Sequence, residues 1–159
     1  MSERMIRDLA AATGLQYTIL RYFNVAGADL QSRIGQATPE ATHLIKVACE
    51  CVQGLRQGMK VFGTDYATRD GTCIRDYIHV EDLASAHVAA LNHMRAGGGS
   101  NILNCGYGRG FTVREVIETV KRIAGKDFAV EETGRREGDP DALTARNERI
   151  RSVLGWQPR

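Results

Sequence analysis

The sequence has no long apolar run and no excess of charge of either sign. Its 159 residues carry 21 Lys and Arg against 19 Asp and Glu, a net charge of +2, and the basic residues are scattered. A basic stripe for nucleic acid and a polybasic patch for membranes are both missing. No apolar stretch approaches the roughly 20 residues that cross a bilayer. The N-terminus has the pattern of a charged amphipathic helix and not of a signal peptide. We therefore expect no nucleic-acid partner and no membrane partner.

Cysteine pairs with metal-site spacing are also missing. The four cysteines form no CxxC motif, and the four histidines have no recognised zinc spacing. Cys49 and Cys51 lie two positions apart in a helical pattern, so their side chains point away from each other. We expect reduced thiols, a cytoplasmic protein and no metal site.

What the sequence does contain is an alternation of helical and strand patterns. A hydrophobic content of 43% and a charged content of 25% are typical of one soluble domain. The alternation predicts an α/β fold with a largely parallel sheet. The predicted helices span 1–13, 38–57, 80–95, 112–124 and 147–154. The predicted strands span 15–24, 60–63, 74–80, 101–105 and 128–132.

Several helix ends have recognisable capping residues. Thr38 and Pro39 have the order of an N-cap and first helical residue. Thr112 and Glu115 have the spacing of a capping box, and Gly125 follows the same helix as a C-terminal glycine. These residues predict where two of the helices begin and where one ends.

Reactive side chains crowd into the segment IRDYIHVED, residues 74–82. Arg75 is suited to an anionic ligand, and Asp76, Tyr77 and His79 are suited to shaping a strand-to-helix junction, so the residues alone leave both roles open. No nucleophile–base pair is present, and no serine has the setting of a nucleophile elbow. The helix that follows carries its apolar face on Ala84, Val88 and Leu91.

Two loops admit two interpretations each. GYGRG lies between a strand and a helix, as a dinucleotide fingerprint does, but it lacks the third glycine and the later acidic residue, which favours a tight turn. GRREGDP places Arg135 and Arg136 near Asp139, a set suited to phosphate and sugar hydroxyls. A solvated charged turn explains that loop equally well, and spacing alone does not decide.

Five segments in one order carry a resemblance to a known family. They are LRYFNVAGAD, VFGTDYATRDGTCIRDYIHVEDLASAHVAAL, LNCGYGRGFTVREV, GRREGDPDAL and LGW. Together they resemble the UDP-glucose 4-epimerases (UDP-galactose 4-epimerases), which are extended short-chain dehydrogenases/reductases. RDYIHVEDLA is shared with sugar-nucleotide dehydratases and other epimerases, whereas RYFNVAGAD with GRREGDP is more particular to the 4-epimerases. The resemblance covers this whole chain but only the C-terminal half of the family's protein.

The resemblance implies a fold and a division of the chain. The fold would be the C-terminal portion of an extended short-chain dehydrogenase/reductase, with an incomplete Rossmann-type parallel sheet and a small mixed substrate-binding domain. Residues 1–24 would be the remnant helix and strand of the NAD-binding Rossmann domain. Residues 25–159 would be the UDP-sugar-binding region, with residues 80–124 packed on the Rossmann sheet.

The resemblance also implies what this chain lacks. The family's glycine-rich NAD turn and catalytic Tyr-x-x-x-Lys precede the matching segment, so we expect an inactive fragment of an NAD-dependent enzyme. The strand at 15–24 would leave an unpaired edge, which predicts a homodimer or strand-swapped oligomer. A free-standing nucleotide-sugar-binding module, a UDP-pentose 4-epimerase and a sugar-nucleotide dehydratase are the alternatives.

The implied substrates are UDP-glucose and UDP-galactose, and the implied residues bind and do no acid–base chemistry. Tyr22 and Phe23 would line the NAD side. Arg75 and Arg136 would clamp the diphosphate through charge-assisted contacts, and Asp139 would hold the ribose. The other implied substrate contacts are Asn24, His43, Leu44, Lys60, Phe62 and Leu143. His43 stands where many members have asparagine, and a leucine at Leu143 leaves N-acetylated hexoses open.

Overall fold

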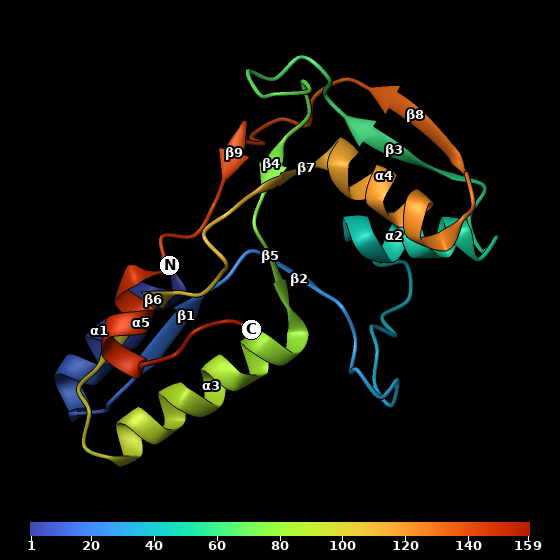
Figure 1. Cartoon of the computed structure of the whole chain (residues 1–159). Coiled ribbons are helices and arrows are strands. Elements are labelled where there is room, and N and C mark those ends of the chain that lie inside the picture. The colour runs from blue at the N-terminus through green and yellow to red at the C-terminus, as the bar shows by residue number, and fades with distance from the viewer.

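The computed structural model describes residues 1–159 and places them in two lobes joined by short strands (Figure 1). The terminal lobe contains α1 (Ser2–Thr13), β1 (Thr18–Arg21), α3 (Val80–Arg95), β6 (Asn101–Asn104) and α5 (Glu148–Leu154). The distal lobe contains α2 (Leu44–Val52), β3 (Gly58–Phe62), α4 (Val113–Ala124) and β8 (Ala129–Thr133). Both chain ends lie in or beside the terminal lobe.

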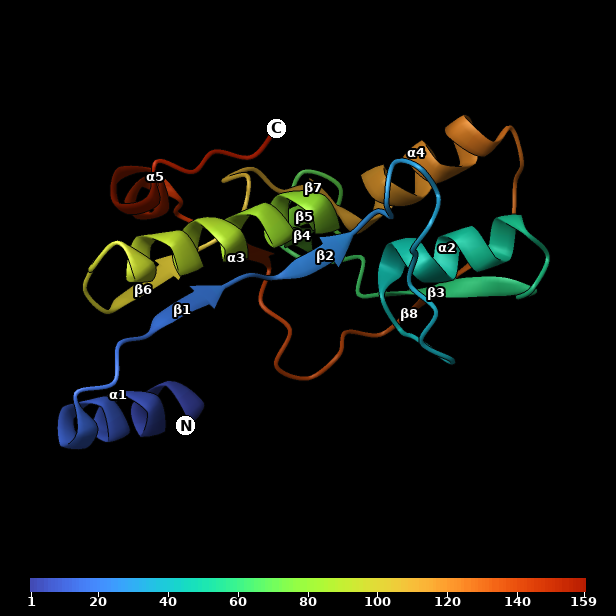
Figure 2. The same cartoon turned by 90° about the horizontal axis from the view of Figure 1, so that it is seen from below.

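The terminal lobe is built on a parallel pair of strands. β1 pairs with β6 in the register Thr18↔Asn101, and α3 lies along one side of the pair while α1 lies on the other (Figure 2). Trp156 closes the core beyond α5, where its indole Nε1 donates to Ser85 Oγ at 2.8 Å. The buried residues of this core are Ile78, Leu83, Ala86, Leu103, Cys105, Ile150 and Trp156.

The predicted apolar face of α3, formed by Ala84, Val88 and Leu91, is wrong, because the helix buries a neighbouring face instead. Leu83 and Ala86 are buried, whereas Val88 and Leu91 are 58% and 49% exposed. Apolar residues occur around much of this helix, so periodicity alone left its orientation open. Contact with β1 and β6 decided it, because these strands receive the Leu83 side.

The distal lobe is a second parallel pair covered by two helices. β3 pairs with β8 from Gly58↔Ala129 to Phe62↔Thr133, and α2 and α4 pack beneath them (Figure 1). The buried residues of its core are Ala48, Cys51, Met59, Val61 and Ile117. α4, which was expected on the Rossmann sheet as part of residues 80–124, instead packs on α2 in this lobe, while α3 and β6 lie beside β1.

Short strands connect the lobes. β2 (Asn24–Ala26) pairs in parallel with β5 (Tyr77–His79). β4 (Ile74–Arg75) lies between antiparallel β7 (Phe111–Thr112) and parallel β9 (Ala142–Leu143). Small parallel sheets with one mixed sheet confirm the predicted α/β class.

Both predicted ends of α2 and the predicted extent of one strand are wrong. α2 begins at Leu44 and not at Thr38, because Glu40 has a left-handed backbone with φ of 52° that a right-handed helix cannot contain. α2 ends at Val52 and not at 57, because the chain leaves the helix through Gly54, whose φ is 75°, and Gly58 already belongs to β3. The predicted strand 15–24 is also divided, since β1 ends at Arg21 and β2 begins at Asn24.

The predicted caps of α4 are confirmed. Thr112 accepts from the Glu115 backbone at 3.1 Å, the Glu115 carboxylate accepts from the Thr112 backbone at 2.9 Å, and Gly125 ends the helix with φ of 62°. None of the helices combines the length and the apolar character that a bilayer crossing needs.

Candidate functional site

Contacts of the loop 134–141 link five of the predicted site residues, because Arg136 packs on Phe62, Asp139 pairs with Arg75, and Arg75 lies opposite Leu143. We call them the arginine cluster: Phe62, Arg75, Arg136, Asp139 and Leu143. Arg75 Nη2 lies 3.3 Å from Asp139 Oδ1, and Nη1 donates to the carbonyls of Ile74 at 2.8 Å and Pro140 at 2.9 Å. Leu143 pairs with Arg75 in the β4–β9 register. The cluster therefore holds one cation, 13% exposed, in a fixed position.

Arg136 is held differently from Arg75. Its guanidinium carbon lies 3.7 Å from the centroid of the Phe62 ring, a cation–π contact that leaves its N–H groups free. The Asp139 N–H donates to the Arg136 carbonyl at 3.3 Å, so both residues belong to one turn. The Arg136 side chain forms no hydrogen bond or ion pair within the chain and is exposed to solvent. Such a guanidinium is available to an anionic ligand.

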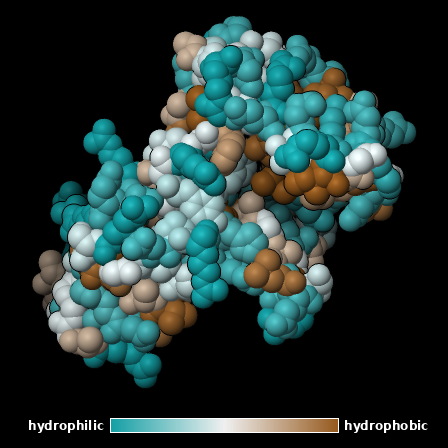
Figure 3. Space-filling model, viewed as in Figure 1, coloured by the Kyte–Doolittle hydropathy of each residue, from teal (hydrophilic) through white to brown (hydrophobic).

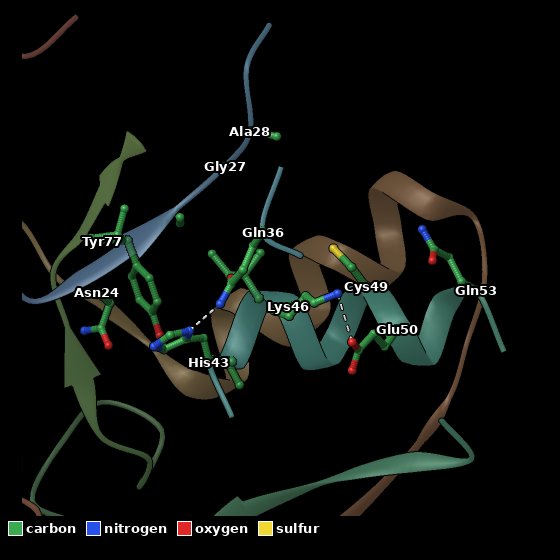
Figure 4. Close-up of a pocket in the computed structure, with 14 residues that line it drawn as sticks. Asn24, Gly27, Ala28, Gln36, His43, Lys46, Cys49, Glu50, Gln53 and Tyr77 are labelled. Atoms are coloured by element: carbon green, nitrogen blue, oxygen red, sulfur yellow. Dashed lines mark hydrogen bonds and ion pairs between the residues drawn. The ribbon is translucent and has the colours of Figure 1, made fainter. Parts of the chain in front are cut away.

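A second group of predicted residues lines a pocket of about 380 Å³ between β2 and α2 (Figure 4). Asn24 and His43 both line this pocket and lie near each other at the end where the Tyr77 ring enters it (Figure 4), and Leu44 begins α2 beside His43. Asn24 Nδ2 donates to the Asp76 carbonyl at 3.3 Å. His43 Nδ1 lies 2.6 Å from Gln36 Nε2, which ties the loop before α2 to the start of that helix.

Tyr77 belongs to the pocket and not only to the strand-to-helix junction, which corrects its predicted role. It pairs with Asn24 in the β2–β5 register and its ring points toward His43 (Figure 4). Burial raises the pKa of its phenol to about 12, so the hydroxyl stays protonated and can donate a hydrogen bond at neutral pH. Arg75 and Tyr77 are two residues apart on extended backbone, where alternate side chains share a side. This strand therefore connects the arginine cluster to the pocket.

Asp76, which lies between Arg75 and Tyr77, has a structural role. Its carboxylate is 1% exposed and accepts from the backbone N–H groups of Tyr107 at 3.1 Å, Gly108 at 3.0 Å and Ala145 at 3.1 Å. A Cβ at Gly106 would lie 2.9 Å from Asp76 Oδ2. The glycine-rich loop is thus a tight turn fitted around a buried carboxylate, as predicted.

His79 is also structural, as predicted. It is the N-cap of α3, and its Nδ1 accepts from the Glu81 N–H at 3.2 Å. This contact satisfies one of the free N–H groups at the start of the helix.

Three predicted residues lie outside both groups. Lys60 is exposed on β3, where Nζ lies 3.4 Å from the Glu131 carboxylate. Tyr22 and Phe23 follow the carboxyl end of β1 in the terminal lobe. The Tyr22 ring is 44% exposed and meets the His87 ring edge-on at 6.2 Å between centroids.

The pocket also contains polar residues that the sequence analysis did not identify. Gln36 reaches it from an irregular loop, for which no periodic pattern exists. Lys46 and Glu50 face it from α2 and form an ion pair at 2.9 Å (Figure 4). Hydrogen bonds from Lys46 and Arg56 hold the pKa of Glu50 below its usual range. The i,i+4 spacing of Lys46 and Glu50 was a usable signal for this pair.

Comparisons with known proteins all find similarity to epimerases. Residues 1–106 match the NAD dependent epimerase/dehydratase family. The UDP-glucose 4-epimerase of Azospirillum brasilense is 60% identical over 159 residues, which are 100% of this chain and 46% of that protein. A UDP-glucose 4-epimerase structure from Brucella ovis in complex with NAD has a TM-score of 0.94 at 44% identity, covering 99% of this chain and 48% of that one.

A third similarity concerns substrate range. The UDP-Glc/GlcNAc 4-epimerase structure from Campylobacter jejuni has a TM-score of 0.79 at 51% identity, covering 100% of this chain and 48% of that one. The chain therefore spans about half the length of the relatives it matches. The structural similarities confirm the predicted Rossmann-type, extended short-chain dehydrogenase/reductase fold.

Proposed function

The chain belongs to the NAD dependent epimerase/dehydratase family, and we propose that it forms the sugar-nucleotide-binding part of a UDP-glucose 4-epimerase. The observation that carries this proposal is the arginine cluster. Arg75 is fixed by Asp139 and two carbonyls, while Arg136 presents an unpaired guanidinium one turn from Asp139. Two cations of this kind suit a diphosphate, whose oxygens accept charge-assisted hydrogen bonds.

Around that diphosphate we assign the remaining roles. Asp139, 38% exposed at its carboxylate, would accept hydrogen bonds from the ribose hydroxyls. Phe62 would pack on the uracil, with backbone groups of Lys60 and Leu44 beside it. Asn24 and His43, which line the pocket, would contact the diphosphate and hexose end of the ligand. Strong contacts to UDP leave the hexose free to turn, which a change of configuration at C4 requires.

A bound NAD would supply hydride-transfer chemistry at the sugar C4. Tyr22 and Phe23 fit one wall of its site, because they follow the carboxyl end of a parallel strand, the edge where such sheets bind dinucleotides. Their aromatic faces would pack against the cofactor and exclude water. The 159 residues contain no Tyr-x-x-x-Lys and no glycine-rich dinucleotide fingerprint. We therefore assign this chain binding and orientation, and we expect no epimerase activity from it alone.

Leu143 sets the proposed substrate range. It pairs with Arg75 beside the diphosphate position and is 37% exposed. An aliphatic side chain there leaves room for an N-acetyl group, and the similar Campylobacter jejuni protein is a UDP-Glc/GlcNAc 4-epimerase. An epimerase of the relatives' full length that carries this segment should convert both UDP-galactose and its N-acetyl counterpart. Activity on the first substrate alone would contradict this part of the proposal.

Calorimetry with UDP on the 159-residue chain tests the binding role. Wild type should bind UDP, and R136M should weaken binding by about tenfold or more, as removal of one partner from a charged contact does. R122M is the matched control, because Arg122 is exposed in the last turn of α4, away from the arginine cluster. Equal UDP affinity for R136M and R122M would contradict the proposed site. Epimerisation of UDP-galactose by the chain alone would contradict the division of labour.

A further inference from the structure

The two consecutive arginines of GRREGDP are held in opposite ways, and the proposed function uses only one of them. Arg135 Nε donates to Asp65 Oδ1 at 2.8 Å, and Nη2 donates to the Asp65 carbonyl. Its guanidinium carbon also lies 4.2 Å from the centroid of the Tyr66 ring. These contacts occupy Nε, Nη2 and one face of the Arg135 guanidinium, so the side chain is tied to Asp65 and Tyr66. Arg136, beside it, has no partner except the Phe62 ring.

We propose that Arg135 is a positioning residue, which fixes the turn that carries Arg136 and so sets Arg136 for the diphosphate. The inference rests on the proposed function, since it concerns how that same site is held in shape. The inference is based on the contacts that both adjacent arginines make with one segment, residues 62–66. Arg136 covers Phe62 at one end of the segment, and Arg135 covers Tyr66 at the other.

The sheet of the distal lobe brings these residues together. β3 and β8 are parallel, so they end at the same edge, with Phe62 opposite Thr133. The Gly63 N–H donates to the Thr133 carbonyl at 2.9 Å, which continues the pairing one residue further. The segment after β3 and the arginines after β8 therefore leave the sheet side by side.

The segment that Arg135 contacts is itself rigid. Tyr66 is 4% exposed, and its N–H donates to the Gly71 carbonyl at 2.9 Å. Gly63 has φ of 80°, and a Cβ there would lie 2.4 Å from Tyr66 Cε2 and 2.9 Å from Arg135 Cγ. The close packing of Tyr66 and Arg135 thus needs a glycine at this point. Because Arg135 is fixed to a rigid segment, the backbone of its neighbour Arg136 is fixed as well.

The exposure of Arg135 and Asp65 distinguishes a positioning role for Arg135 from a role in folding stability. The Arg135 and Asp65 side chains are 45% and 75% exposed, and exposed ion pairs contribute little to folding. A loop that must be ordered when ligand binds lowers affinity, so prior ordering of the Arg136 turn strengthens binding. The loss of Arg135 should therefore weaken ligand binding and leave the melting temperature nearly unchanged.

A double-mutant cycle on the 159-residue chain tests this inference. UDP affinity and melting temperature are measured for wild type, R135M, R136M, the double variant R135M/R136M and the exposed control R122M. R135M should weaken UDP binding roughly tenfold, within the range seen for coupled neighbours, with a melting temperature like that of R122M. Because Arg135 acts through Arg136, the double variant should bind UDP no more weakly than R136M alone.

The outcomes distinguish the inference from the proposed function. No UDP binding by wild type contradicts the proposed function and removes the basis of the inference with it. Binding by wild type and its loss in R136M, with R135M equal to R122M, overturns the inference alone. Effects of R135M and R136M that multiply in the double variant also overturn it, because Arg135 would then act independently. If R135M unfolds, D65A, which removes the carboxylate acceptor of Arg135, is judged by the same criteria.

Discussion

At the scale of single residues, one buried carboxylate joins three segments that are distant in sequence. Asp76 lies between Arg75 and Tyr77 and accepts from the backbone of the glycine-rich loop and of the segment after β9. These hydrogen bonds therefore fix the position of the strand that carries the proposed ligand contacts. A buried carboxylate that satisfies three N–H groups is difficult to replace, because each group left unpaired adds its own desolvation cost.

We expect D76A to lower the free energy of unfolding by roughly 2–4 kcal/mol, because the backbone donors of Tyr107, Gly108 and Ala145 lose their acceptor. D76N keeps one carbonyl oxygen and should lose less. Urea denaturation followed by circular dichroism measures the difference. E118A is the control, since the Glu118 side chain is 66% exposed and has only a 3.9 Å contact with Lys121. Equal stability of D76A and E118A would refute this account of Asp76.

Asp29 supplies a pH-dependent contact in the loop before α2. Its carboxylate accepts from the side chain of Arg33 at 2.8 Å and from the N–H groups of Arg33 at 3.1 Å and Gln31 at 3.2 Å. The hydrogen bond from the Arg33 side chain is the main cause that lowers the pKa of Asp29 from 3.8 to about 2. Since the folded pKa is the lower one, the stabilisation is present above about pH 4 and is lost as the pH falls through 2.

R33M should therefore raise the pKa of Asp29 toward 3.8, though not fully, because the backbone donors remain. An NMR titration of the Asp29 carboxyl carbon gives the midpoint in each variant. R4M serves as the control, since Arg4 pairs with Asp8 on α1 and not with Asp29. An unchanged Asp29 midpoint in R33M would show that Arg33 is not the cause.

At the scale of elements, α4 is anchored at its first turn by more than its own cap. Thr112 is fully buried, accepts from the Glu115 N–H and donates to the Asp70 carboxylate. Arg69 forms a two-pronged ion pair with Glu115 from the same polar loop. The loop before β4 and the start of α4 are therefore one hydrogen-bonded unit.

T112A should lower the free energy of unfolding by about 1–2 kcal/mol, the usual effect of removing a threonine N-cap. The loss of the Asp70 contact acts in the same direction. T112S keeps the hydroxyl and is the matched control. Chemical denaturation measures the stability, and hydrogen exchange at the Glu115 N–H, which loses its acceptor, should quicken in T112A. If T112S is destabilised as much as T112A, the buried methyl group and not the cap is responsible.

At the scale of the whole molecule, the terminal lobe leaves surfaces that usually have partners. β1 pairs only with β6. No residue of α1 is buried, and its apolar side chains Met5 and Leu9 are 64% and 53% exposed. The rest of the visible surface is largely hydrophilic, with apolar residues in separate patches (Figure 3). An open strand edge beside an exposed apolar helix face favours association with another chain.

We therefore predict that the 159-residue chain forms a dimer or a strand-swapped oligomer in light scattering. M5K/L9K places charge on the apolar face of α1 and should shift the chain toward monomer. A11K is the control, because Ala11 lies on the opposite side of that helix. A strictly monomeric wild-type chain at all concentrations would contradict the prediction.

Local sequence patterns predicted those elements whose ends depend on nearby residues. The helix α4 is the best case, because Thr112, Glu115 and Gly125 act within the helix they delimit. The start of α2 was missed, because Glu40 takes its left-handed backbone from a loop that no periodic pattern describes. In the site, Arg75, Arg136 and Asp139 were named through a family resemblance. The spacing of Arg136 and Asp139 in GRREGDP left a solvated turn equally open.

The sequence by itself determined the alternation of helices and strands, the capped ends of α4 and the motifs of the family. These features depend on side-chain periodicity and on contacts between near neighbours along the chain. Only the tertiary structure decided that Tyr77 faces the pocket, that α3 buries Leu83 and that Arg136 is free while Arg135 is engaged. Each of these outcomes depends on which strands pair and where they end, because the parallel pairing of β3 with β8 brings Phe62 and Tyr66 to the two arginines.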